Sequence, residues 1–157
     1  MTLRILIPVD GSDLALDAVH HALRLRREGL QADFVLATVQ EPTYLYEMMI
    51  APSTEVLERV TSAVGIRALA GAEALFSAAG VSYQREIGSG DPAQTLLEIS
   101  ERCQCEAIIM GARGRGSMRS ALFGSVSQAV LNASRLPVTI VKHAALESGA
   151  EGVSARS

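Results

Sequence analysis

The stretch Met110-Gly111-Ala112-Arg113-Gly114-Arg115-Gly116-Ser117-Met118-Arg119-Ser120-Ala121-Leu122-Phe123-Gly124-Ser125-Val126-Ser127 joins a short apolar run, residues 107–110, to an apolar pattern of helical spacing, residues 126–133. This order is typical of a buried strand, a glycine-rich loop and a helix. Glycines let a backbone approach a ligand closely, and the amide groups that begin a helix attract anions. We therefore expect an anion site here, with phosphate as the natural ligand. A solvated surface loop is the alternative that these residues alone leave open.

Charge is concentrated in the same loop. The chain has a formal net charge of −3, yet residues 112–125 contain three arginines and no acid. We expect at most one of Arg113, Arg115 and Arg119 to contact phosphate directly and the others to be solvated. An acidic chain without a long basic stripe is not typical of a nucleic-acid-binding protein. The loop thus predicts a small anionic ligand and not a polymer.

Strand-like and helical patterns alternate along the rest of the chain. Strands are expected at residues 3–9, 34–39, 81–87, 107–110 and 138–141, and helices at about 15–25, 54–79, 92–103 and 126–133. Ser12 is the expected N-cap of the first helix, and Asp91 with Pro92 is the expected start of the third. The polar alternation of residues 81–87 predicts a half-exposed edge strand. Alternation of strands and helices predicts an α/β fold with a parallel sheet covered on both faces.

Length and composition limit the remaining choices. The 157 residues predict one domain, which we place at 1–143, followed by a mobile tail at 144–157. With 48% hydrophobic and 4% aromatic residues, the core is expected to be aliphatic. No apolar run reaches the length of a membrane span and no signal peptide is recognisable, so a cytoplasmic protein is expected.

Packing is the expected role of Cys103 and Cys105, with redox sensitivity left open. The loop at residues 40–53 is long enough to suggest a lid or a partner surface.

Two common phosphate-binding motifs do not fit the glycine-rich loop. Gly111 and Gly116 have the spacing of a P-loop, but Ser117 stands where a lysine is required. Gly114 and Gly116 begin a dinucleotide fingerprint, but Arg119 replaces its third glycine. The spacing that is present is Gly-x2-Gly-x9-Gly-Ser, from residue 111 to residue 125.

In this spacing the chain resembles the ATP-binding branch of the universal stress protein family, as it does in the segment Pro8-Val9-Asp10 at the end of the first strand. The resemblance extends from residue 3 to about residue 142. It implies a single-domain, open, parallel five-stranded sheet with strand order 3-2-1-4-5 and helices on both faces. It also implies an adenine-nucleotide site, with ATP as the first choice and Mg²⁺ as an optional bridging cation. The residues expected to bind the nucleotide are Pro8, Val9, Asp10, Val39, Met110, Gly111, Arg113, Gly114, Gly124, Ser125, Val126 and Ser127.

For Asp10, the expected contact is with the ribose or the adenine, although an Asp after a strand often caps the following turn with no ligand.

The resemblance further implies a stress-response protein that acts as a regulatory homodimer, joined through the last strand, Val138 to Val141, with an unknown protein partner. No positioned base, nucleophile or metal set is recognisable, so binding is expected ahead of catalysis. Three alternatives stay open: an interaction module of the same fold that binds no nucleotide, a slow ATPase or phosphotransfer protein, and an enzyme of the related α-hydrolase fold, for which the chain is short.

Overall fold

A computed structural model of the chain describes residues 2–41, 53–114 and 123–143. Five strands and four helices are described: β1 (Leu3–Pro8), α1 (Leu16–Arg27), β2 (Ala32–Gln40), α3 (Thr54–Ala78), β3 (Tyr83–Ser89), α4 (Pro92–Arg102), β4 (Ala107–Gly111), α5 (Ser125–Ala133) and β5 (Val138–Val141). All pairings in the sheet are parallel, and the strand order is β3-β2-β1-β4-β5. The expected α/β fold and strand order are confirmed.

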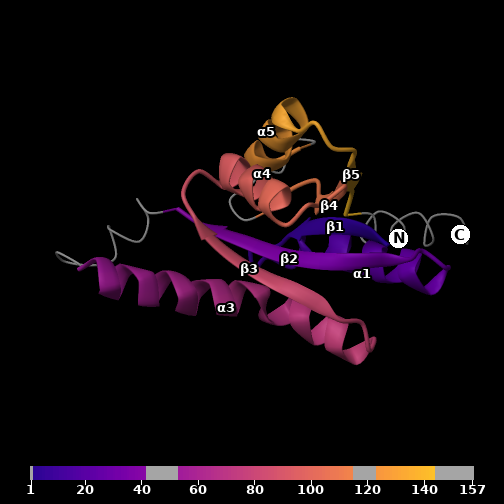
Figure 1. Ribbon diagram of the computed structural model, residues 1–157, viewed down its shortest axis with the longest axis horizontal. Coiled ribbons are helices and arrows are strands. Elements are labelled where there is room, and N and C mark those ends of the chain that lie inside the picture. The colour runs from indigo at the N-terminus through magenta and orange to yellow at the C-terminus, as the bar shows by residue number, and fades with distance from the viewer. Residues whose placement is uncertain (1, 42–52, 115–122, 144–157) are drawn as a thin grey trace, which may run out of the picture.

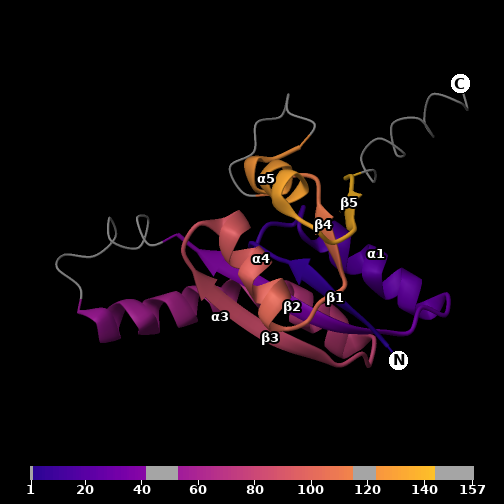
Figure 2. The ribbon, with the colours of Figure 1, turned by 45° about the horizontal axis from the view of Figure 1, so that its top comes forward.

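Helices cover both faces of this sheet and enclose two apolar cores. Figures 1 and 2 show α4 and α5 on one side of the strands and α3 on the other. The first core joins the sheet to α1 and α3, and its members include Phe34 and Phe76, whose rings meet edge to face with centroids 5.3 Å apart. The second core joins the sheet to α4 and α5. Successive side chains of a strand point to opposite faces, so β2 supplies Phe34 and Leu36 to the first core and Val35 to the second.

Two glycines inside the long helix α3 have different reasons to be there. A Cβ placed on Gly65 would lie 2.5 Å from Cγ2 of Ile87 on β3, so only glycine allows the helix to lie this close to the sheet. A Cβ placed on Gly71 would lie 3.5 Å from Cδ2 of Leu16, which is an ordinary van der Waals contact. The helix therefore needs the first glycine for packing and could accept a larger residue at the second.

The starts of α4 and α1 test two capping predictions. Asp91 is the N-cap of α4, and its carboxylate accepts a hydrogen bond from the Gln94 amide at 3.0 Å, as expected. The prediction that Ser12 is the N-cap of α1 is wrong, because α1 begins at Leu16 and its N-cap is Ala15. The Ser12 hydroxyl accepts from the Ala15 amide at 3.3 Å and so caps the turn that precedes the helix.

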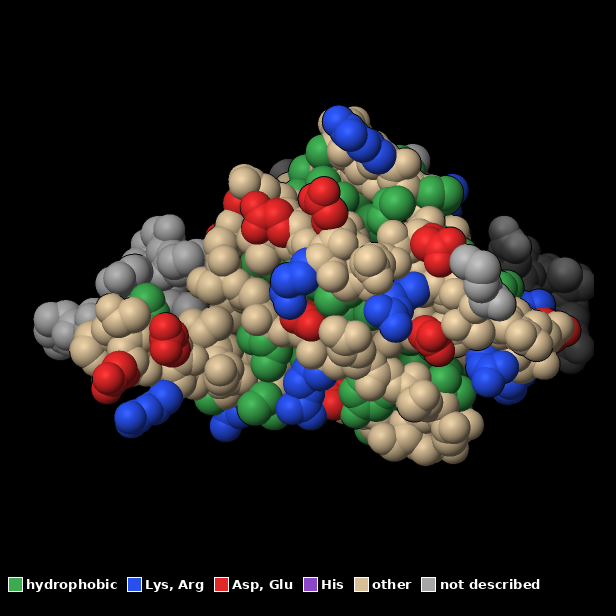
Figure 3. All heavy atoms as spheres, viewed as in Figure 1, with side chains coloured by type: hydrophobic (Ala, Val, Ile, Leu, Met, Phe, Trp, Pro, Cys, Tyr) green, Lys and Arg blue, Asp and Glu red, His purple; other side chains and the backbone are tan. Residues whose placement is uncertain are grey.

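Among the described residues, two ion pairs involve the edge strand β3, Arg85 with Glu73 and Glu86 with Arg102. Acidic and basic side chains are interspersed over the face of the molecule in Figure 3. Glu73 of α3 accepts hydrogen bonds from the Tyr83 hydroxyl at 2.5 Å and from Arg85 Nη2 at 2.7 Å. Burial alone would raise the pKa of Glu73, but the hydrogen bonds and the positive charge of Arg85 outweigh it and hold the pKa below its ordinary value. The expected half-exposed edge strand is confirmed, but it spans Tyr83–Ser89 and not residues 81–87, since Gly88 continues the strand.

No described helix is long and apolar enough to cross a membrane. Most of the expected loop at 40–53 lies outside the described residues, as do Arg115, Arg119 and the expected tail at 144–157. Of that loop, Gln40 belongs to β2 and Ser53 is the N-cap of α3, where its hydroxyl accepts from the Val56 amide at 3.2 Å.

Candidate functional site

A cavity of about 340 Å³ opens at the carboxyl ends of β1, β2 and β4. It lies where the chain leaves β1 for a helix on one face of the sheet and leaves β4 for a helix on the other. Such a switch point is the usual ligand-binding position of open α/β sheets. Every residue predicted from the sequence to bind a nucleotide lines this cavity: Pro8, Val9, Asp10, Val39, Met110, Gly111, Arg113, Gly114, Gly124, Ser125, Val126 and Ser127.

The N-terminus of α5 forms one side of the cavity. Gly124 is the N-cap and makes no side-chain capping bond, and the first amide that bonds back to it along the helix belongs to Gln128, at 3.0 Å. Amides of the first helical turn have no carbonyl within the helix to bond to, and they carry the positive end of the helix dipole. The N–H groups of Ser125, Val126 and Ser127 can therefore serve an anion.

Ser127 also holds the loop in place. Its hydroxyl is buried and donates to the Ala112 carbonyl at 2.7 Å, with the Gly124 carbonyl 3.0 Å away. The Gly124 amide donates to the same Ala112 carbonyl at 2.7 Å. These bonds fasten the start of α5 to the end of β4. The Ser127 hydroxyl is thus already engaged within the chain, which leaves its amide as the group available to a ligand.

Asp10 faces the cavity from the end of β1. Its Oδ1 atom accepts from the Ser12 amide at 2.9 Å and from the Ser12 hydroxyl at 2.6 Å, so the carboxylate caps its own turn. Its other oxygen lies against Gly114. A Cβ on Gly114 would clash with Oδ2 and would lie 3.1 Å from Cγ. The same carboxylate therefore fixes the turn after β1 and meets the glycine-rich loop after β4.

The rest of the cavity wall is mainly apolar. Pro8, Val9, Val39 and Met110 lie on the side of β1, β2 and β4, as the sequence predicted. Sequence reasoning missed seven further lining residues: Ala15, Ala37, Thr38, Gln40, Glu41, Pro92 and Leu96. Leu96 belongs to the apolar face of a helix that the sequence did reveal, but nothing in the sequence brings that helix to this site.

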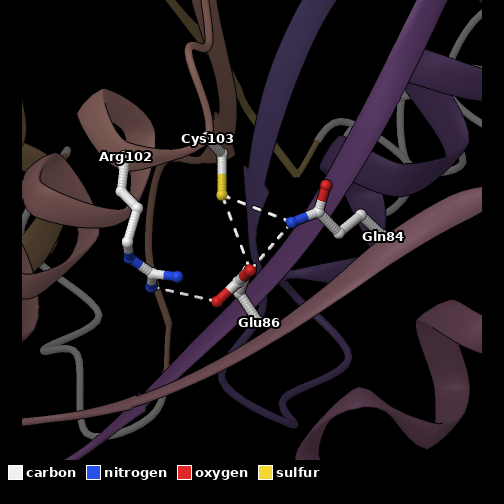
Figure 4. A network of polar contacts seen from close by, with 4 residues as sticks. All are labelled: Gln84, Glu86, Arg102 and Cys103. Atoms are coloured by element: carbon white, nitrogen blue, oxygen red, sulfur yellow. Dashed lines mark hydrogen bonds and ion pairs between the residues drawn. The ribbon is translucent and has the colours of Figure 1, made fainter.

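Cys103 lies apart from the cavity, in a polar network with Gln84, Glu86 and Arg102 (Figure 4). Gln84 Nε2 is 3.5 Å from the sulfur, and the thiol lies 3.6 Å from Oε1 of Glu86. The other carboxylate oxygen of Glu86, Oε2, pairs with Arg102 at 3.0 Å. Burial raises the pKa of the Cys103 thiol and raises that of Cys105 to about 11. Both thiols are buried in the second core, which confirms the packing role. Among the described residues, no group of three or more His, Cys, Asp or Glu is placed to hold a metal ion.

Comparison with known proteins agrees with this architecture. Residues 1–142 match the universal stress protein family. Universal stress protein MJ0531 of Methanocaldococcus jannaschii is 29% identical over 139 residues, which cover 88% of this chain and 81% of that protein. The solved structure of hypothetical protein MJ0577 superposes with a TM-score of 0.74 at 24% identity, over 91% of this chain and 97% of that one.

Two other solved structures carry a ligand. A universal stress protein in complex with cAMP has a TM-score of 0.61 at 24% identity, over 88% of this chain and 95% of that one. A universal stress family protein of Arabidopsis thaliana with AMP bound has a TM-score of 0.66 at 20% identity, over 92% and 94%. At these identities the likeness shows a shared fold. The fold, its strand order and the family match over nearly the whole chain together show that this protein belongs to the universal stress protein family.

Proposed function

We propose that this protein binds an adenine nucleotide, with ATP as the first choice, in the cavity between the ends of β1 and β4. The observation that supports this most strongly is the order of chemical groups along the cavity. Apolar side chains line the cavity at the ends of β2 and β1, the Asp10 carboxylate follows β1, and a glycine-rich loop with a helix N-terminus follows β4. A nucleotide has the same order of parts: an apolar base, a sugar with hydroxyl groups, and phosphate.

Each part of the nucleotide then has a partner. The base lies against Val39, Pro8 and Val9, and the ribose hydroxyls donate to Asp10. A Cβ on Gly111 would lie only 3.0 Å from the Leu14 carbonyl oxygen, so the end of β4 packs closely against the turn before α1, and the glycine-rich loop that follows faces the sugar and phosphates. The amides of residues 125–127 and the guanidinium of Arg113 hold the phosphates. The cAMP and AMP complexes of relatives with this fold support an adenine nucleotide as the ligand class.

The proposed role is regulatory binding, in response to stress, by a homodimer. Mg²⁺ would be held mainly by the phosphates of ATP, because a divalent cation of this kind needs few protein ligands when a nucleotide supplies oxygens. β5 is an edge strand with four β-forming residues, and such an edge needs cover. Pairing of β5 with its copy in a second chain would supply that cover and leave the nucleotide site to influence the choice of protein partner.

The experiment is to measure ATP and AMP binding by calorimetry and to identify any nucleotide released when the purified protein is denatured. Gly114→Val should abolish binding, because the added side chain fills the space taken by the Asp10 carboxylate. Gly71→Ala, on α3 and outside the cavity lining, is the matched control and should bind as the native protein does. Absence of binding by the native protein would overturn the proposal in favour of an interaction module, and full binding by Gly114→Val would place the site elsewhere.

A further inference from the structure

A second hollow, the α4/α5 groove, lies between the two helices that cover one face of the sheet (Figures 1 and 2). Its volume is about 360 Å³, and it shares no lining residue with the cavity at the ends of the strands. The floor is made of small or apolar side chains: Ala93 and Leu97 of α4, and Ala129 and Ala133 of α5. Alanines leave this space open, because longer side chains on the facing helices would fill it.

One wall of the α4/α5 groove is acidic. It carries the carboxylates of Asp91, Glu98 and Glu101 and the side-chain amide of Gln94. Helical residues three and four apart face the same side, so these positions form one row along the groove, about 15 Å long. The Gln94 amide donates to Glu98 at 3.2 Å, which leaves the charge of Glu98 in place. Figure 3 shows acidic side chains over α4.

The negative charge of this row is not balanced by a cation within the described ranges. None of the ion pairs found there includes Asp91, Glu98 or Glu101. Arg102, the basic residue in the last turn of α4, is engaged with Glu86 of β3 at 3.0 Å. Glu101 lies near the negative end of the helix dipole, and Glu98 three residues earlier repels it. A cation from outside the chain would therefore relieve an unfavourable arrangement of charge.

We propose that the α4/α5 groove binds a helix of a partner protein, and that this helix carries lysine or arginine beside small apolar side chains. A groove between two helices accepts an amphipathic helix, whose apolar side chains lie on the floor while its cations pair with the acidic row. Basic residues that recur every three or four positions match the spacing of the carboxylates. Since the groove and the cavity share no lining residue, the inference does not depend on nucleotide binding.

The probe for this groove is a synthetic helical peptide of alanine, leucine and lysine. Its lysines repeat the three-residue and seven-residue spacings of Glu98, Glu101 and Asp91, and a peptide with glutamate in place of lysine is the counterpart. Fluorescence anisotropy at low salt measures binding to the native protein. The lysine peptide should bind and the glutamate peptide should not. Added salt should weaken the binding, because exposed charges are screened.

Two charge variants test the acidic wall. Glu98→Gln combined with Glu101→Gln should weaken binding of the lysine peptide roughly fivefold, the effect expected of two lost surface ion pairs. Glu55→Gln combined with Glu58→Gln is the matched control, because it removes two exposed carboxylates from α3 on the opposite side of the sheet. Equal weakening by the control would overturn the proposal, since the peptide would then respond to net charge and not to the groove.

Two size variants test the floor without changing the charge. Ala129→Leu fills the groove and should weaken peptide binding at least tenfold, whereas Ala63→Leu, at an exposed position of α3, should leave it unchanged. Full binding by Ala129→Leu, or no binding of the lysine peptide by native protein, refutes the proposal. If native protein self-associates in sedimentation and Ala129→Leu abolishes this, the occupant is a second copy and the partner helix is wrong. Native protein that binds the peptide but no nucleotide would contradict the proposed function and leave this inference standing.

Discussion

The contact between Gly114 and Asp10 predicts that Gly114→Ala destabilises the protein when Asp10 is present and stabilises it when Asp10 is replaced by alanine. Gly114 has no left-handed backbone angle, so an L-residue can adopt its conformation. The obstacle to a side chain is the Asp10 carboxylate, because an added Cβ would fall on Oδ2. Gly114→Ala must therefore displace a carboxylate whose Oδ1 accepts two hydrogen bonds from Ser12, at 2.9 and 2.6 Å.

The magnitude follows from those bonds. Hydrogen bonds to a charged group contribute about 1.5–3 kcal/mol each, and Asp10 is only half-buried, so we expect the displacement to cost about 1.5–3 kcal/mol in total. Replacing glycine where the backbone permits it gains about 0.4–1 kcal/mol by restricting the unfolded chain. The net destabilisation expected of Gly114→Ala is thus about 1–2 kcal/mol, or roughly 2–8 °C in thermal midpoint at this chain length.

The decisive comparison repeats the substitution in an Asp10→Ala background. With the carboxylate gone, Gly114→Ala should stabilise the protein by about 0.4–1 kcal/mol instead of destabilising it. Urea denaturation of the ligand-free protein measures all four members of this cycle, and the expected coupling energy is about 1.5–3 kcal/mol. An equal cost of Gly114→Ala in both backgrounds would refute the reasoning, because the clash would then lie with some group other than Asp10.

Three further predictions concern the rest of the fold. Gly65→Ala should lower stability by about 1–3 kcal/mol through overpacking, whereas Gly71→Ala on the same helix should raise it by up to about 1 kcal/mol; paired thermal melts measure both. The pKa of Glu73 is lowered on folding, so its contribution to stability is complete above its ordinary value of 4.5 and is lost as the pH falls through the folded value. Urea denaturation measured at a series of acid pH values should therefore show that the free energy of unfolding falls less steeply with decreasing pH for Glu73→Gln than for native protein. Identical pH profiles for the two proteins would contradict this. Because burial raises the pKa of Cys103 and Cys105, iodoacetamide should label them slowly in native protein and completely after denaturation, as followed by mass spectrometry; rapid native labelling would contradict their burial.

The elements were predictable because their patterns are local. The buried strands are runs of aliphatic residues, and the start of α4 carries its own capping signal in Asp91 and Pro92. Boundaries were less accurate where polar residues continue a strand. β2 extends to Gln40, which pairs with Ser89, beyond the apolar run that predicted the strand to end at residue 39. The same reliance on apolar residues left Thr38 and Gln40 out of the predicted site.

The start of α1 shows a different limit. Ser12 has the character of a helix N-cap, and its hydroxyl does accept an amide three residues ahead. The same hydroxyl donates to Asp10, which holds Ser12 in the turn after β1, and the helix therefore begins only at Leu16. The choice between two nearby partners depends on the path of the turn, which the sequence pattern does not contain. The residues of the glycine motif, in contrast, line one cavity together with the end of β1, because the carboxyl ends of neighbouring parallel strands meet at one edge of the sheet.

Electrostatics favours one orientation of a nucleotide bound in this cavity. The start of α5 carries the equivalent of about half a positive charge, and Arg113 lines the same side, while Asp10 lies at the end of β1. A phosphate placed 4 Å from the Asp10 carboxylate would be repelled by about 4 kcal/mol per unit charge near a protein surface, which corresponds to roughly three orders of magnitude in binding. A sugar hydroxyl at that position donates a hydrogen bond to the same carboxylate instead. Charge therefore places phosphate at α5 and sugar at β1. The base is then left at β2, where Ala37 and Val39 line the cavity beside the polar residues Thr38, Gln40 and Glu41.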